Sequence, residues 1–162
     1  MASLTVLKFD TPEGAGQMLN KVVSLQKQQL IKLQDAATVT WPEGKNAPKT
    51  KQAVNLVGMG ALDGAFWGML FGLLFFVPFF GLAVGAAFGA LGGKMRDYGI
   101  DDDFIKKVRE QVTEGTSALF LLTSDAVMDK VIAELKGEKF ELIASNLTKD
   151  QEEELMAAFS AE

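Results

Sequence analysis

The residues that could carry out chemistry in this 162-residue chain are few, because it contains neither cysteine nor histidine. Without cysteine there is no thiolate to serve as a nucleophile, to form a disulfide or to bind zinc. Without histidine, the commonest general base and the commonest transition-metal ligand are both missing. The sequence therefore predicts a protein that is not an enzyme and that uses no cofactor.

Carboxylates remain, and the most concentrated group is the triplet Asp101, Asp102 and Asp103. Carboxylate oxygens bind hard cations such as Ca²⁺, but a calcium site draws more ligands from a loop at wider spacing. Here the triplet precedes a segment with helical periodicity that extends to about Val112. One aspartate can cap that helix, and the others favour the positive end of its dipole. We therefore expect a helix start and no metal site, with calcium binding as the alternative.

Charge is distributed unevenly along the chain. The net charge of −5 and the isoelectric point near 4.8 argue against nucleic acid as a partner, because no basic surface is available to displace counterions. Of the charged residues only Asp63 lies within residues 52–93, and residues 64–93 contain seven of the twelve phenylalanines. Residues 42–51, with two prolines and three lysines, are predicted to be the loop that leads into this apolar segment.

The apolar segment contains two series of glycines spaced four residues apart. On a helix such residues share one face and leave a smooth groove, which lets another backbone approach closely. Eight glycines are expected to mediate helix packing and the formation of a homo-oligomer: Gly60, Gly64, Gly68, Gly72, Gly81, Gly85, Gly89 and Gly93.

Pro78 divides the segment into two predicted helices, because proline interrupts the backbone hydrogen bonds of a helix. The two helices would be about 25 Å and about 22 Å long, which is shorter than a hydrocarbon core of roughly 30 Å. Lysines flank both ends, so the positive-inside rule places both ends in the cytoplasm. The segment is interpreted as a hairpin that turns at Pro78 and enters the bacterial cytoplasmic (inner) membrane, with both termini cytoplasmic.

The hairpin contains many large aromatic side chains. Eight of them are expected to face lipid: Phe66, Trp67, Phe71, Phe75, Phe76, Phe79, Phe80 and Phe88. Asp63 is expected at the level of the headgroups, either as an interfacial anchor or as a polar ring at the mouth of an oligomeric pore. A hairpin buried within an oligomer without lipid is the alternative, but this aromatic surface exceeds what a small domain can cover.

The two polar arms show the periodicities of an α/β domain. Residues 3–9 and 30–41 are predicted strands on either side of an amphipathic helix, with Asp35 as the one misfit on the apolar face of the second strand. Residues 116–123 and 139–145 flank another amphipathic helix. Residues 116–123 are apolar on both faces from Ala118 to Leu122, which predicts a central strand.

Two strand–helix–strand units of this kind form a ferredoxin-like α+β sandwich with a four-stranded antiparallel sheet. We therefore predict a split ferredoxin-like domain made of residues 1–51 and 95–162. The glycine-zipper hairpin, residues 52–94, is inserted between its second and third strands. A last helix is predicted after Thr148, which forms a capping box with Gln151.

With its paired glycine series around Pro78 and its flanking α/β arms, the chain resembles an uncharacterised bacterial family of predicted membrane proteins. That family has a domain of unknown function with a glycine-zipper segment, and it is similar to some general-stress proteins. The resemblance covers most of the chain. It implies association with a membrane and a role in stress, and it brings no catalytic residues.

The leading functional hypothesis is a non-enzymatic, homo-oligomeric protein inserted in a phospholipid membrane, where it scaffolds or remodels lipid. An oligomeric pore or channel, with Asp63 at its mouth, is the first alternative. The second alternative is a soluble, oligomeric domain that senses a small ligand or regulates a stress response. In that case Thr5, Leu7 and Phe9 could belong to a ligand-binding face of the sheet, an argument that rests on fold analogy.

Overall fold

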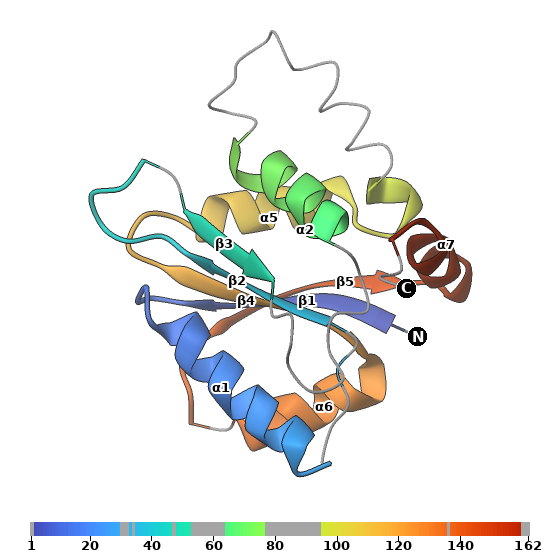
Figure 1. Ribbon diagram of the computed structural model, residues 1–162, viewed down its shortest axis with the longest axis horizontal. Helices are drawn as coiled ribbons and strands as arrows, with labels where there is room; N and C mark the ends of the chain where they lie inside the picture. The colour runs from blue at the N-terminus through green and yellow to red at the C-terminus, as the bar shows by residue number, and fades with distance from the viewer. Residues whose placement is uncertain are drawn as a thin grey trace, which may run out of the picture.

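A five-stranded antiparallel sheet forms the centre of the protein, with helices on both of its faces (Figure 1). This architecture comes from a computed structural model, which describes residues 2–29, 33, 35–46, 48–52, 64–76, 95–135 and 137–159. Its strands are β1 (Ala2–Phe9), β2 (Asp35–Thr40), β3 (Lys49–Gln52), β4 (Ser117–Ser124) and β5 (Glu141–Leu147).

The strand order in the sheet is β3-β2-β4-β1-β5. Val6 in β1 lies opposite Phe120 in β4 on one side and opposite Ile143 in β5 on the other. The strand predicted to be central, residues 116–123, corresponds to β4, which lies between β2 and β1 and is buried along nearly its whole length. The predicted loop at residues 42–51 differs from the structure, because its last residues form the edge strand β3.

Two separate layers of helices cover the sheet. The helices are α1 (Gly14–Lys27), α2 (Gly64–Phe71), the π-helix η1 (Gly72–Phe76), α5 (Asp102–Gln111), α6 (Asp125–Glu134) and α7 (Lys149–Phe159). Figure 1 shows α1 and α6 on one face and α2 with α5 on the other. Each layer has its own apolar core, one with Leu7 and Leu119 facing α1 and α6, the other with Val6 and Phe120 facing α2, η1 and α5.

Two helix starts follow the short-range signals in the sequence. The Asp101 side chain accepts a hydrogen bond from the Phe104 amide at 2.8 Å, which caps α5. At α7, the Thr148 amide donates to Gln151 Oε1 at 2.9 Å and the Gln151 amide donates to Thr148 Oγ1 at 3.2 Å. Each pair satisfies backbone donors that have no partner within the helix, and both predicted caps are confirmed.

Helix α2 and η1 place their aromatic side chains in the protein core. Phe66, Trp67, Phe71 and Phe75 are each at most 3% exposed, whereas the sequence analysis expected them to face lipid. The Trp67 and Phe71 rings stack with centroids 5.6 Å apart, and Phe71 meets Phe120 of β4 edge-on at 5.2 Å. The sheet thus supplies the apolar surface that the aromatic residues were expected to find in a membrane, and burial there is favourable by the same hydrophobic effect.

A buried hydrogen bond joins this aromatic layer to the sheet. The Trp67 indole Nε1 donates to Asp35 Oδ2 at 3.2 Å, and the Ala36 amide donates to Asp35 Oδ1 at 2.8 Å. Asp35 is completely buried at the start of β2. A buried carboxyl group is tolerated where hydrogen bonds replace its hydration, so these contacts explain why the one misfit of the predicted strand is accommodated.

The membrane predictions need correction. Among the residues that the structure describes, no helix combines the length and the apolarity needed to cross a membrane. Helix α2 is eight residues long and its aromatic side chains are already covered by the sheet. The predictions of transmembrane helices, of lipid binding and of a location in the bacterial inner membrane are therefore wrong, whereas the predicted turn of the hairpin at Pro78 lies outside the described residues.

The Trp67–Asp35 contact can be tested with paired Trp→Phe substitutions. Trp67→Phe should lower the free energy of unfolding by about 2–4 kcal/mol, because it leaves a cavity and removes a donor from a buried carboxyl group. Trp41→Phe is the control, since the half-buried Trp41 donates its indole hydrogen bond to Lys45 O at an exposed site, and it should cost less than about 1 kcal/mol. Urea denaturation would measure both changes. Equal losses of unfolding free energy in the two variants would contradict a stabilising role for the buried Trp67–Asp35 hydrogen bond.

Candidate ligand pocket at the start of helix α1

A pocket opens where β1 ends and α1 begins. Its volume is about 510 Å³, and it is closed on the far side by the segment between α6 and β5, which includes Gly137, Glu138 and Lys139. The apolar part of its lining comes from Phe9 and Met18, which are 6% and 3% exposed. The Phe9 ring also lies against Phe140, with centroids 6.2 Å apart, so the apolar part is held by residues from both sides of the pocket.

Close contact between Phe9 and Gly14 shapes the turn that enters α1. A Cβ atom added at Gly14 would lie 2.5 Å from Phe9 Cβ, which is closer than any real contact of this kind. The Gly14 amide donates to Thr11 O at 3.3 Å and so closes the turn. A residue without a side chain is therefore required at position 14 for the helix to begin this close to the strand.

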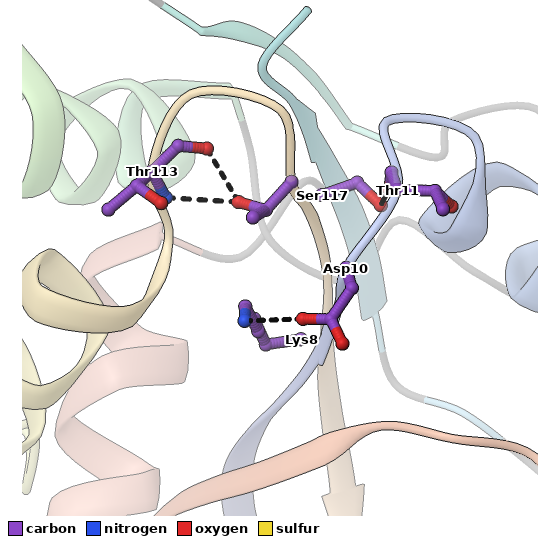
Figure 2. Close-up of polar contacts among 6 residues, drawn as sticks. Lys8, Asp10, Thr11, Thr113 and Ser117 are labelled. Atoms are coloured by element: carbon purple, nitrogen blue, oxygen red, sulfur yellow. Dashed lines mark hydrogen bonds and ion pairs between the residues drawn. The ribbon is translucent and has the colours of Figure 1, made fainter.

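The first turn of α1 is capped by a side chain from a different strand. Glu13, at the N-cap position, makes no side-chain cap. Instead Ser117 of β4 accepts a hydrogen bond from the Ala15 amide at 2.9 Å and donates its own hydroxyl to Thr11 O at 2.6 Å. Figure 2 shows Ser117 beside Thr11 at this end of the sheet. The pocket wall is thereby fixed to a central strand.

The start of β4 is held in place by a compact turn next to Ser117. Thr116 Oγ1 donates to Thr113 O at 2.6 Å and accepts from the Thr113 amide at 3.0 Å. Figure 2 shows these two contacts as the dashed lines that start at Thr113. The Trp41 amide donates to Thr116 O at 3.0 Å, which ties the same turn to the end of β2. Ser117 therefore has a well-defined position from which to cap α1.

Charged side chains of both signs surround the pocket. Lys8 Nζ lies 2.8 Å from Asp10 Oδ1 (Figure 2), and Lys21 of α1 forms an ion pair with Glu138 across the pocket. The hydrogen bond from Lys8 lowers the pKa of Asp10 below its ordinary value, and the positive charges of Lys8 and, more weakly, Lys139 act in the same direction. Asp10 thus remains a carboxylate at neutral pH.

The pocket offers groups that can bind a ligand. They are two ammonium groups, two carboxylates, the amide of Gln17 and an apolar surface. Within the described part of the chain, no group of three or more carboxylates lies close enough together to hold a metal ion. The aspartates at positions 101–103 serve the start of α5 as described above.

The predicted packing and lipid-facing residues that the structure describes do not line this pocket. Gly64 begins α2, Gly72 begins η1 and Phe76 ends it. Gly68 is exposed, and among the described residues no atom lies within 4 Å of a Cβ added to it. The other predicted packing, turn, lipid-facing and pore residues lie outside the described residues: Gly60, Asp63, Pro78, Phe79, Phe80, Gly81, Gly85, Phe88, Gly89 and Gly93.

The predicted ligand face overlaps the pocket at one residue. Thr5 and Leu7 are buried under the layer of α1 and α6, at 1% and 0% exposure, and only Phe9 reaches the pocket. The sequence analysis missed Lys21 and Glu138, because they are 117 positions apart and no periodicity connects them. The local signals that do point here are the turn-forming sequence that starts at Asp10 and the glycine at position 137, which has a φ of +92°.

The chain can be compared with known proteins at the level of family. A family described as a protein of unknown function (DUF1269) matches residues 61–160. The chain belongs to this family. The match confirms the resemblance to a family of unknown function, and it covers α2 and all the described helices and strands that follow it. No curated protein and no solved structure matches the chain.

The close contact at Gly14 is tested by two Gly→Ala substitutions two residues apart. Gly14→Ala should lower the free energy of unfolding by about 1–3 kcal/mol, because Phe9 has to move. Gly16→Ala should raise it by up to about 1 kcal/mol, since no described atom lies within 4 Å of the added Cβ and alanine favours a helix. Chemical denaturation measures both, and a stable Gly14→Ala protein would contradict the contact.

The ion pair between Lys8 and Asp10 predicts that the pKa of Asp10 changes when Lys8 is replaced, and NMR can follow this change. Since the pKa of Asp10 is lower in the folded protein than in the unfolded chain, its contribution to stability is complete above the unfolded pKa of about 3.9 and disappears as the pH falls through the folded pKa. Lys8→Met should raise the pKa of Asp10 towards its ordinary value. Lys139→Met should change it less, because Lys139 has the weakest influence on this carboxylate. A larger change of the Asp10 pKa in Lys139→Met than in Lys8→Met would contradict the conclusion that Lys8 is the main cause of the lowered pKa.

Proposed function

We propose that this protein is a non-enzymatic, ligand-sensing domain that binds a small organic molecule in the pocket at the start of α1. The observation that carries the proposal is the pocket itself, with a volume of about 510 Å³ and a lining that joins an apolar surface to paired opposite charges. Small-molecule sites typically have volumes of roughly 300–1,000 Å³ and combine apolar walls with a few polar groups. The second alternative of the sequence analysis therefore replaces the membrane hypothesis.

The lining favours a ligand that is both zwitterionic and partly apolar. Phe9 and Met18 offer an apolar surface to a hydrocarbon group. Lys21 and Lys139 can accept a carboxylate or phosphate, while Asp10 and Glu138 can accept an ammonium group or a hydroxyl. Free amino acids and similar small zwitterions fit this combination.

The strand order supports the proposal of a ferredoxin-like framework. Strands β2, β4, β1 and β5 with helices α1 and α6 follow the chain as two strand–helix–strand units, with both helices on one face. In this proposal β3 extends the sheet at one edge, and the inserted apolar segment contributes α2 and η1, which cover the second face. The first face then retains the pocket.

The contacts around the pocket suggest how binding is sensed. Its walls belong to α1, to β1 and to the segment before β5, and Ser117 links the first turn of α1 to the central strand β4. In the absence of a ligand, the ion pair between Lys21 and Glu138 is the direct contact across the opening. A zwitterion that pairs with both residues replaces this ion pair and changes the separation of the two walls, which other parts of a regulatory system can detect.

The proposal is tested by thermal unfolding of the full chain in the presence of a panel of amino acids and other small zwitterions. A ligand present at a hundredfold excess over its Kd stabilises the folded state by about 2.7 kcal/mol, which raises Tm by about 5 °C or more for a chain of this size. Gln17→Trp should fill the pocket and abolish the shift. Asn20→Trp is the control, since Asn20 is exposed on the same helix outside the pocket, and it should leave the shift unchanged.

Two outcomes would contradict the proposal. The first is a panel in which no compound raises Tm or gives heat of binding in calorimetry. The second is a ligand whose effect is equally large in the Gln17→Trp protein, because that ligand would bind elsewhere.

A further inference from the structure

The two edges of the sheet differ in how they are protected against pairing with another strand. At one edge β3 has four residues, of which Lys49 and Lys51 are exposed. At the other edge β5 has seven residues without lysine, arginine, proline or glycine, and its one charged residue, Glu141, is the first. Short strands and lysines are the usual means of preventing edge-to-edge association. Among the residues that the structure describes, the β3 edge is protected in this way and the β5 edge is not.

The face of β5 that lies on the side of α1 and α6 is also uncovered. Leu142 is 49% exposed, and Ala144 and Asn146, which follow it on the same face, are exposed as well. Ile132 of α6 is 38% exposed, and these two are the large exposed hydrophobic residues among those described. The other face of β5 is buried at Ile143. The helix layer thus ends before the last strand and leaves an apolar strip beside an open edge.

We propose that a second copy of this chain pairs its own β5 with this edge, antiparallel and across a twofold axis at Ile143. In that register Leu142 lies opposite Ala144 of the second copy, and the same pair occurs again on the other side of the axis. Ile143 lies opposite its own copy, and Glu141 lies opposite Ser145. Apolar side chains therefore meet apolar side chains along the strip, and no like charges face each other.

The neighbouring register explains why the axis is placed at Ile143. An axis at Ala144 sets Leu142 opposite Asn146, so the apolar side chains no longer meet. The β5 sequence is complementary to itself in the register centred on Ile143, and this self-complementarity favours a second copy of the chain as the occupant.

Such a pairing joins the two sheets into one of ten strands. A twofold axis perpendicular to the sheet keeps the helices α1 and α6 of both copies on the same face, so the exposed Ile132 side chains and the Leu142–Ala144 pairs belong to one continuous layer. The inference is independent of the ligand pocket and goes beyond the proposed function.

The mass of the full chain in solution tests the proposal. Light scattering or sedimentation over a concentration series should give twice the 17.5 kDa of one chain. Leu142→Lys should reduce the mass to that of one chain and leave the circular dichroism spectrum unchanged, because the side chain is already half exposed. Thr50→Lys is the matched control on β3 and should retain the dimer. A monomer at every concentration, or an assembly that Leu142→Lys does not disrupt, would overturn the proposal.

The absence of cysteine allows the register to be tested directly. Directly opposite residues in antiparallel strands have Cα atoms about 4.5–5.5 Å apart, which suits a disulfide. Ile143→Cys should form a reducible dimer on mild oxidation, whereas Ala144→Cys and the control Thr50→Cys should remain largely uncrosslinked. Preferential crosslinking of Ala144→Cys would overturn the proposed register, and efficient crosslinking of Thr50→Cys would overturn the choice of edge.

Discussion

The hydrogen bond between the Trp67 indole and the buried carboxyl group of Asp35 links the aromatic layer of the protein to its sheet. A buried indole N–H and a buried carboxyl group each lose their hydration, and this hydrogen bond compensates part of that loss for both. Phe71 and Phe120 complete an aromatic cluster around the contact. Together these contacts help to fix the position of α2 over β2 and β4.

Short-range signals in the sequence predicted much of the fold, because their physical causes are local. The cap at Asp101 and the capping box at Thr148 each involve residues only three positions apart, so the pattern contains the whole interaction. The apolar run from Ala118 to Leu122 identified a central strand, since a strand covered on both faces needs apolar residues on both. In contrast, β3 is a polar edge strand, and its lysines resemble those of a loop.

The surroundings of the apolar segment and the pocket could not be predicted because they depend on distant residues. A helix that is apolar on all sides suits either lipid or a deep core, and the sheet surface that decides between them includes Phe120, far along the chain from Trp67. The pocket likewise depends on Lys21 and Glu138, which are 117 positions apart. In the sequence Asp35 was a polar residue on an apolar face, and its contact with the distant Trp67 is part of the explanation.

The position of the first strand between two of the last has a consequence for synthesis on the ribosome. Ala2 lies opposite Ser124 in β4 and opposite Leu147 in β5, so β1 acquires its neighbours only after β4 and β5 have been translated. Closing such large loops costs entropy and slows folding. The aromatic residues of α2 are translated before β4, which later covers them. The nascent chain therefore carries uncovered aromatic side chains, and it needs chaperones at this stage more than a protein with local strand pairing does.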